Sequence, residues 1–346
     1  MIHRTKQRYG ARMSEPVSLS EHEDGMGTAD AVVPAETIID VIARRALRVL
    51  ASTPLEEGDY IAHGLWGHEL AAKLADPLQR ENLYLLDVRS RDAYDEGHID
   101  GARHVDFSAW ASPENLARLP HDRKIIVICD TGLMAAQVAA GLRLLGYDAA
   151  VPRTGINGWA QSSMTQSLVE EIQAARFPVM RVPPKDGCIE APRDIVFDHP
   201  DEKDYEIIAA RANIVFGGAL GNCSSTANIV SATSLSGMLE EDAGRGRLFL
   251  LDLRREEDFE GVGHIEGSVR MDFDAVAMPE NLKKLPRDRK IVTICYTGNL
   301  AAQLATVLRM LDYDVEALAY GMVGWTRTPT TYMYLKDIQK ADNPLV

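Results

Sequence analysis

Two cysteines, Cys129 and Cys295, occupy corresponding places in a sequence repeat. The first lies in VICDTGLMAAQVAAGLRLLGYD and the second in TICYTGNLAAQLATVLRMLDYD, and 295 − 129 = 166 residues separate them. In each copy the cysteine ends an apolar run, and a short glycine-containing loop then leads into an apolar-periodic segment that predicts a helix. A thiol between a strand end and a helix N-terminus lies where a thiolate is stabilised. The repeat therefore predicts two reactive thiols.

The loop after each cysteine has the composition of an anion-binding nest. Successive backbone N–H groups in a strand–loop–helix can curl around the sulfur, and Gly132 and Gly298 supply the tight or positive-φ turn that this requires. We expect such a nest to lower the thiol pKa and to stabilise a persulfide, Cys–S–S⁻, the covalent intermediate of sulfur transfer, without an adjacent histidine. The other loop residues are Asp130, Thr131, Leu133 and Met134 in the first copy and Tyr296, Thr297, Asn299 and Leu300 in the second.

The elements that position these loops follow the same order in both copies. Continuous apolar runs at 83–88, at 248–253 and before each cysteine predict short strands buried on both faces of a sheet. Tyr60-Ile61 and Ile229-Val230 predict the first strand of each copy. Because predicted helices alternate with these strands, we expect parallel βαβ units with right-handed crossovers.

The repeat also predicts the division of the chain into domains. We expect a disordered leader over 1–33, because this stretch is polar and lacks periodicity. A domain with its own leading helix is predicted over 34–176 and a second one, also with a leading helix, over 204–346. The proline and charge content of 177–203 indicates an exposed linker.

Composition limits the partners. The chain has 346 residues, of which 46% are hydrophobic and 25% charged, as in soluble proteins that bury a core in each half. A formal charge of −14 argues against nucleic acid or an anionic membrane as a main partner, because both favour clustered lysine and arginine. No run of about 18 apolar residues could span a membrane. A small anionic substrate is still compatible with this charge, because it responds to the local potential.

The two remaining cysteines, Cys188 and Cys223, are interpreted as ordinary thiols. No pair of cysteines has CxxC spacing, so neither a structural zinc site nor a dithiol redox motif is predicted, and we expect no metal and no cofactor. The N-terminal stretch is basic but lacks the apolar segment of a secretory signal. A reducing cytoplasm, where free thiols persist, is the expected compartment.

The ordered set of motifs, present twice, resembles the tandem rhodanese (sulfurtransferase) family. The motifs are Asp87-x-Arg89, Gly97-His98-Ile99-x-Gly101-Ala102, the Cys129 loop and Gly155-x-x-Gly158-Trp159, followed by Asp252-x-Arg254, Gly263-His264-Ile265-x-Gly267, the Cys295 loop and Gly321-x-x-Gly324-Trp325. The resemblance implies an α/β fold with a five-stranded parallel sheet and helices on both faces in each domain. It also implies a persulfide on the loop cysteine, loaded by thiosulfate or a similar small anionic sulfur donor. Cyanide or a thiol, either a small one or that of a thioredoxin-like protein, would accept the sulfur.

The sequence departs from the family pattern inside the loops. Many members have basic residues there, but neither loop contains lysine or arginine. Tandem members often keep a cysteine in the C-terminal domain alone, whereas this chain has one in both copies. Asp130 places a carboxylate beside Cys129, where the second copy has Tyr296. At ~6 Å and an effective dielectric constant of ~20, a like-charge pair costs roughly 3 kcal/mol. Arg153 is the candidate to offset that charge, and we predict that Cys295 is the preferred sulfurtransferase site.

Support of the local structure rather than direct chemistry is the expected role of the other motif residues. Support of the loop is predicted for the acid–arginine pairs Asp87, Arg89, Asp252 and Arg254. His98 and His264 are expected to stabilise turns or to lie at the surface, and Trp159 and Trp325 to anchor the core.

Three other functions were weighed. A phosphatase or arsenate reductase of the same fold needs a longer loop ending in an arginine that clamps phosphate. Here Ala135 and Ala301 occupy the sixth position after each cysteine, and neither loop has arginine, which argues against that activity. A binding or regulatory module without turnover stays open, above all for the first domain because of Asp130. A sulfur carrier that relays a persulfide between Cys129 and Cys295 also stays open.

Overall fold

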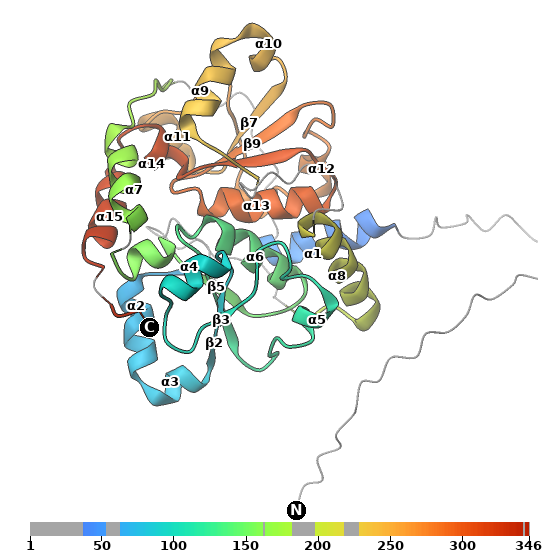
Figure 1. Ribbon diagram of the computed structural model, residues 1–346. Helices are drawn as coiled ribbons and strands as arrows, with labels where there is room; N and C mark the ends of the chain where they lie inside the picture. The colour runs from blue at the N-terminus through green and yellow to red at the C-terminus, as the bar shows by residue number, and fades with distance from the viewer. Residues whose placement is uncertain are drawn as a thin grey trace, which may run out of the picture. The chain divides into compact units, whose positions relative to one another are not determined.

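The computed structural model describes residues 37–52, 63–161, 163–181, 198–217, 228–341 and 343–345 (Figure 1). The predicted leader over 1–33, the strand predicted at Tyr60-Ile61, Cys188, Cys223 and the central part of the predicted linker lie outside these residues.

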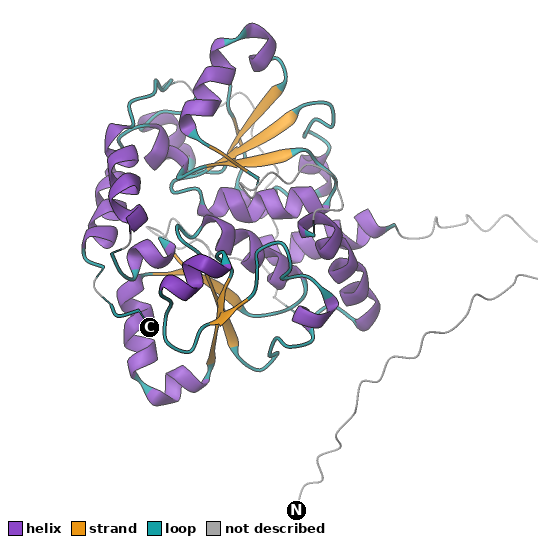
Figure 2. Cartoon of the chain, viewed as in Figure 1, coloured by secondary structure: helices purple, strands orange, loops and turns teal. Residues whose placement is uncertain are grey.

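Two five-stranded sheets, each entirely parallel, form the framework (Figure 2). The strand orders are β1-β5-β4-β2-β3 and β6-β10-β9-β7-β8. We call the sheets and the helices between their strands the first and second lobes. The strands of the first lobe are β1 (Gly64–Leu65), β2 (Leu83–Asp87), β3 (Arg103–His104), β4 (Lys124–Ile128) and β5 (Ala149–Pro152). Those of the second lobe are β6 (Ile229–Val230), β7 (Leu248–Asp252), β8 (Val269–Arg270), β9 (Lys290–Ile294) and β10 (Val315–Leu318). The predicted fold class is confirmed.

The helices follow the predicted alternation. In the first half of the chain they are α1 (Ile38–Ala51), α2 (Gly67–Ala75), α3 (Pro77–Glu81), α4 (Arg91–Glu96), α5 (Pro113–Leu116), α6 (Leu133–Leu144), the 3-10 turn η1 (Gly155–Gly158) and α7 (Ser163–Ala174). In the second half they are α8 (Glu202–Phe216), α9 (Ala232–Glu240), α10 (Asp242–Arg245), α11 (Glu256–Gly261), η2 (Phe273–Ala275), α12 (Pro279–Leu282), α13 (Asn299–Met310), α14 (Gly321–Trp325) and α15 (Pro329–Gln339).

Alternate residues of the central strands enter different cores, which explains their continuous apolar runs. In β4, Ile125 and Val127 join the core that contains α6, whereas Ile126 and Ile128 join the core that contains Leu70 of α2. Side chains that alternate across a strand are all apolar only when both faces of the sheet are covered. The sheet therefore has helices on both faces.

Helices α6 and α13 pack against each other and join the two lobes (Figure 1). Nearly every residue of both helices is buried, as in a helix that is apolar on all sides. One hydrophobic core contains residues of both lobes. Within the contact the Thr306 hydroxyl donates a hydrogen bond to the Gln137 carbonyl oxygen at 3.1 Å. Since both helices begin just after a cysteine loop, this packing brings the two loops together.

Each leading helix is bound to both lobes. The Arg45 side chain of α1 donates to the Leu144 carbonyl at the end of α6 at 2.9 Å, and Arg211 of α8 donates to the Met310 carbonyl at the end of α13 at 3.0 Å. Both arginines thus pair carbonyls that a helix C-terminus leaves open. The last turn of α8 places the Phe216 ring 5.1 Å from that of Trp110 in the first lobe, and α1 contacts η2 of the second lobe.

The segment that follows each terminal helix also crosses to the other lobe. The Trp325 indole donates to the Pro178 carbonyl at 2.9 Å, and the Trp159 indole donates to the Pro344 carbonyl at 2.9 Å. The start of the predicted linker therefore contacts the second lobe, where Met180 forms an isolated bridge with His264. Both tryptophans are buried, as predicted for core anchors. The domain boundaries themselves stay a prediction. No helix among the described residues is long and apolar enough to cross a membrane.

Candidate active site

Both repeat cysteines lie directly after the central strands β4 and β9, at the carboxyl edge of each sheet. Gly132 and Gly298 precede α6 and α13 with φ of 86° and 84°, as the sequence predicted. A Cβ atom at Gly132 would lie 2.8 Å from the Arg153 carbonyl oxygen, so the site excludes a side chain as well as favouring a left-handed backbone. The glycine holds the loop tightly around the sulfur.

Backbone N–H groups point at the sulfur in both loops. The N–H groups of Gly132 and Ala135 donate to the Cys129 Sγ at 3.1 and 3.3 Å, and that of Ala301 donates to the Cys295 Sγ at 3.4 Å. These donors belong to the first turn of a helix, where the partial positive charge of the helix dipole is concentrated. Each loop is therefore built to stabilise negative charge on sulfur.

Burial nevertheless raises the pKa of both thiols. Cys129 is 1% exposed and Cys295 is 0% exposed. Desolvation raises the pKa of Cys129 to about 11, the N–H of Ala135 lowers it and the charge of Asp130 raises it further. Desolvation also raises the pKa of Cys295, with only backbone N–H groups acting against it. The N–H groups of the nest lower the thiol pKa, as predicted, but the loss of solvation outweighs these hydrogen bonds, so the net shift of both thiols is upward.

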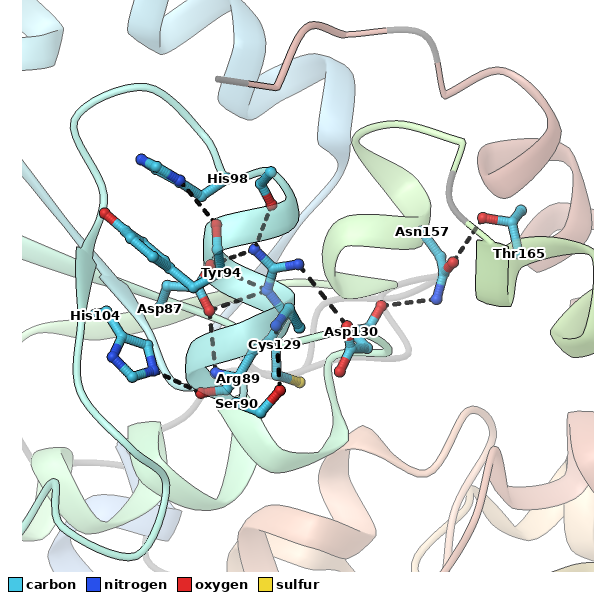
Figure 3. A network of polar contacts seen from close by, with 12 residues as sticks. Asp87, Arg89, Ser90, Tyr94, His98, His104, Cys129, Asp130, Asn157 and Thr165 are labelled. Carbon is cyan, nitrogen blue, oxygen red and sulfur yellow. Dashed lines mark hydrogen bonds and ion pairs between the residues drawn. The ribbon is translucent and has the colours of Figure 1, made fainter.

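The glycine–tryptophan turn of each lobe holds the cysteine loop in place by hydrogen bonds to its backbone. The N–H of Ile156 donates to the Cys129 carbonyl at 2.9 Å, and that of Met322 donates to the Cys295 carbonyl at 2.8 Å. In the first lobe the Asn157 amide adds a bond to the Asp130 carbonyl at 2.8 Å, and Thr165 donates to Asn157 at 2.7 Å (Figure 3). Sequence reasoning missed these two residues. The repeat did offer a signal, since only the first copy has a polar residue at this place in the turn.

The acid–arginine pairs are buried and pair with each other. Arg89 donates to Asp87 at 2.7 Å and to the Gly97 carbonyl at 2.8 Å. Arg254 repeats this arrangement with Asp252 at 2.7 Å and the Gly263 carbonyl at 2.8 Å. Each pair thus ties a strand end to the following turn. In the same turns, His98 and His264 lie with Nδ1 3.0 Å from the carbonyl oxygens of Tyr94 and Phe259, and their rings stack on those residues.

The environment of Asp130 distinguishes the first site. Its carboxylate is one third exposed, at 33%, and lies 4.0 Å from the Arg89 guanidinium (Figure 3). Burial raises the pKa of Asp130, the charge of Arg89 lowers it and that of Asp87 raises it. Arg153, the residue expected to offset this charge, places its guanidinium 4.4 Å from the Trp66 ring centroid. Arg89 is thus one cation beside Asp130, and the role expected of Arg153 stays a prediction.

Tyr296 takes the place of that carboxylate in the second site. Its hydroxyl donates to Asp258 at 2.5 Å and accepts from the Arg255 N–H at 3.2 Å, and the side chain is buried. Burial and the bond to Asp258 raise the pKa of Tyr296, so the phenol is neutral. Burial and backbone N–H groups are the main influences on the pKa of Cys295, whereas the charge of Asp130 also acts on Cys129.

Two polar atoms of the Cys295 loop are buried with no hydrogen-bond partner among the described residues. They are Thr297 Oγ1 and Asn299 Nδ2. Gln303 donates to the other amide atom, Asn299 Oδ1, at 3.2 Å, which orients the amide so that its N–H₂ group is the open one. Buried polar groups are normally paired, so these two open atoms of the Cys295 loop are candidates for contact with a ligand.

The other predicted loop residues line the two loops. Leu133 and Leu300 are buried, and Thr131 and Met134 are partly exposed. Leu133 reaches the second site, since a Cβ atom at Gly298 would lie 2.8 Å from Leu133 Cδ2. The two loops are therefore in contact. Within the part of the chain that the structure describes, no group of three or more histidine, cysteine or carboxylate side chains could hold a metal ion.

Known proteins resemble both copies. The family model of the rhodanese-like domain matches residues 70–162 and 231–328. A stretch of 80 residues, 23% of the chain, is 40% identical to the probable adenylyltransferase/sulfurtransferase MoeZ of Mycobacterium tuberculosis, but it spans only 20% of that protein. The thiosulfate sulfurtransferase GlpE of Actinobacillus succinogenes is 29% identical over 90 residues, which are 26% of this chain and 79% of GlpE. The solved structure of a thiosulfate sulfurtransferase from Pseudomonas aeruginosa is 17% identical and covers 83% of this chain and 48% of its own, with a TM-score of 0.28.

Proposed function

Because this chain belongs to the rhodanese-like domain family and carries the domain twice in tandem, we propose that it is a sulfurtransferase with Cys295 as its preferred site. The observation that carries the proposal is the Cys295 loop, in which a helix N-terminus faces the sulfur and two buried donors, Thr297 Oγ1 and Asn299 Nδ2, are open. The curated relatives MoeZ and GlpE, which are sulfurtransferases by name, support the reaction class.

The proposed reaction has two transfers. The Cys295 thiol loses its proton to solvent, and the thiolate attacks the outer sulfur of thiosulfate or a similar donor. The new S–S bond forms as the old one breaks, and sulfite leaves with the electron pair. An acceptor, either cyanide or a thiolate, then attacks the outer sulfur of the persulfide and releases the Cys295 thiolate. This is covalent catalysis by a thiolate that backbone N–H groups stabilise by hydrogen bonds, while solvent takes the proton.

The raised pKa of the resting thiol favours a role for the nest later in the cycle. A thiol with a pKa of about 11, such as Cys129, is ionised in only about one molecule in ten thousand at pH 7. A persulfide is a stronger acid than the thiol from which it forms, so a larger fraction of it is ionised at the same pH. The N–H groups around the sulfur thus stabilise the loaded state more than the empty one, and this favours transfer from the donor.

Electrostatics favour Cys295 over Cys129. Asp130 raises the pKa of the Cys129 thiol and repels a dianionic donor, whereas Tyr296 is neutral and anchored by Asp258. The open donors of the second loop can bind the oxygen atoms of a sulfur oxyanion. At the place of Asn299 the first loop has Leu133, which offers no hydrogen bond.

A second role is proposed for the first lobe. Asp130 and its ion pair with Arg89 favour a domain that binds or regulates without turnover, or that accepts sulfur from the neighbouring loop. The contact between Leu133 and Gly298 supports the second of these roles. A small thiol or a thioredoxin-like protein is the proposed acceptor, and the cytoplasm the proposed compartment.

The assay that tests the proposal is cyanide-dependent thiocyanate formation from thiosulfate by the intact chain. The unchanged chain, Cys129→Ser and Cys295→Ser are compared. We expect Cys295→Ser to lose most of the activity and Cys129→Ser to keep most of it. Equal losses in both variants would reject the preference for Cys295, and inactivity of the unchanged chain with thiosulfate and with polysulfide would reject the sulfurtransferase assignment.

A further inference from the structure

A cavity of about 580 Å³ lies between the first lobe and the C-terminal helix α15. One wall comes from the start of α2 and from η1, and the other comes from α15 and the segment that follows it. A volume of this size is typical of pockets that hold small-molecule ligands, and such pockets often lie where two parts of a fold meet. The side chains in its walls include Trp66, His68, Met333, Lys336, Lys340 and Asn343.

Hydrogen bonds between the two halves of the chain hold these walls in place. The Asn343 N–H and side-chain amide both donate to the Trp159 carbonyl, at 2.9 and 3.0 Å, and the Trp159 indole donates to the Pro344 carbonyl at 2.9 Å. The Gln161 amide donates to the Ile338 carbonyl of α15 at 2.9 Å. The cavity is therefore formed before a ligand enters, which lowers the entropy that binding costs.

The cavity combines an aromatic ring with positive charge. The Lys340 N–H donates to the Lys336 carbonyl at 3.2 Å, so the helical turn brings both lysine side chains to the same wall. Trp66 belongs to the other wall, and the Arg153 guanidinium lies 4.4 Å from the centroid of its ring. The nearby Glu69 carboxylate already accepts a hydrogen bond from the Trp66 N–H at 2.7 Å. An indole and two ammonium groups in one cavity suit a ligand that has both a flat ring and an anionic group.

The corresponding place in the second lobe lacks these groups, although the scaffold is the same. There α7 contacts α14, as α15 contacts η1 in the first lobe. The counterparts of the indole and the two lysines are neither aromatic nor basic, and in the same order they are Ser231, Glu170 and Ala174. Phe177 takes the place of Asn343 and packs its ring 4.8 Å from that of Trp325. The shared scaffold thus forms without an indole or lysines at this place, which favours a binding role for them in the first lobe.

We propose that this cavity binds a nucleoside phosphate, with the base stacked on Trp66 and the phosphate groups paired with Lys336 and Lys340. An inorganic anion would leave the indole uncovered, and an uncharged ring would leave the two lysines without a counter-charge. The cavity has room for a base, a sugar and a phosphate together. The proposal concerns a second site and does not depend on the sulfurtransferase function.

Titration calorimetry of the full chain with ADP tests the proposal. We expect Lys336→Ala/Lys340→Ala to weaken ADP binding at least about tenfold, as for lost bonds to a charged group. Both lysines are exposed, so their replacement leaves the fold intact. The matched control is Lys283→Ala/Lys284→Ala, which removes two exposed lysines that follow α12 in the second lobe and should leave the affinity unchanged.

The tryptophan fluorescence gives a second measurement. Trp66 is partly exposed, whereas the other three tryptophans, Trp110, Trp159 and Trp325, are buried. ADP should therefore quench part of the emission of the unchanged chain and none of that of Trp66→Phe. Because Trp66→Phe keeps a smaller ring, it should bind ADP more weakly than the unchanged chain but more tightly than Trp66→Leu.

Two further probes separate the parts of the ligand. Pyrophosphate has the charge without the ring and adenosine has the ring without the charge, and we expect each to bind at least about tenfold more weakly than ADP. Equal affinities for pyrophosphate and ADP would show a site for phosphate alone and would overturn the nucleoside assignment. No binding of ADP at millimolar concentration, or an ADP affinity that neither the lysine pair nor Trp66→Leu changes, would overturn the inference as a whole.

Discussion

Replacing Asp130 by asparagine should activate Cys129. The change removes one negative charge and keeps the size of the side chain, and it is made in the Cys295→Ser background so that Cys129 is followed alone. Asp130 raises the pKa of Cys129, whose value in the unchanged chain is about 11. The variant tests whether a single carboxylate sets the difference between the two sites.

The expected change in the pKa of Cys129 depends on three charges, those of the thiolate, Asp130 and Arg89. A carboxylate ~6 Å from a thiolate costs roughly 3 kcal/mol at an effective dielectric constant of ~20. The Arg89 guanidinium lies 4.0 Å from Asp130, and the carboxylate is 33% exposed, so both the ion pair and the solvent reduce this cost. A remainder of about 1.4 kcal/mol corresponds to about one pKa unit. We therefore expect the pKa of Cys129 to fall by about one unit in Asp130→Asn.

Two probes separate the effect of Asp130 on the ionisation of the Cys129 thiol from its repulsion of an anionic sulfur donor. With neutral iodoacetamide, a tenfold gain in thiolate at neutral pH is partly offset by lower intrinsic nucleophilicity, which leaves a gain of roughly three- to fourfold. With thiosulfate the gain should be larger, because repulsion of the dianion is also removed, and this extra gain should shrink as salt screens the charges. Asp148→Asn is the control, since Asp148 pairs with Lys124 at the opposite end of β4, 3.4 Å away. An unchanged inflection for Cys129 alkylation together with unchanged thiosulfate loading would refute the electrostatic reasoning.

Three further substitutions test the second site. Gly298→Ala should destabilise the fold by about 2 kcal/mol or more and abolish loading of Cys295. The reason is that φ of Gly298 is 84° and the new methyl group would lie 2.8 Å from Leu133 Cδ2. A melting temperature equal to that of the unchanged chain would contradict this prediction. Asp252→Asn should lower the free energy of unfolding measured in urea by about 3 to 5 kcal/mol, since it leaves the buried Arg254 guanidinium without its charge partner. A loss below about 1 kcal/mol would contradict the structural role of this ion pair. Asn299→Leu, which installs the residue of the first loop, should slow thiosulfate loading of Cys295 about tenfold and leave polysulfide loading unchanged, because only the oxyanion uses the amide; equal effects on both donors would remove Asn299 from donor recognition.

Much of the framework was predictable because it depends on local patterns. Continuous apolar runs such as LYLLDV predicted strands buried on both faces, and the structure divides Ile125 and Ile126 between two cores. The glycine after each cysteine predicted the positive φ observed at Gly132 and Gly298. The first strand of the second copy was predicted correctly at Ile229-Val230, which is β6. In the first copy the strand was predicted at Tyr60-Ile61, whereas β1 is Gly64–Leu65, because a strand of two residues carries no periodicity.

The errors and omissions have a common cause in long-range packing. The expected lowering of the thiol pKa neglected desolvation, whose size depends on the burial of Cys129 and Cys295 under the completed fold. The contact between Leu133 and Gly298 arises only when α6 and α13 pack together. The apolar character of both helices on all sides was a signal for such packing, but it does not show which element each helix packs against.

The most direct test of the central claim is the intact mass of the reduced chain after incubation with thiosulfate and removal of the excess donor. We predict that the unchanged chain gains the mass of one sulfur atom, that peptide mapping assigns it to Cys295, and that Cys295→Ser abolishes this gain while Cys129→Ser keeps it. No gain in the unchanged chain, or an equal gain that persists in Cys295→Ser, would contradict the account.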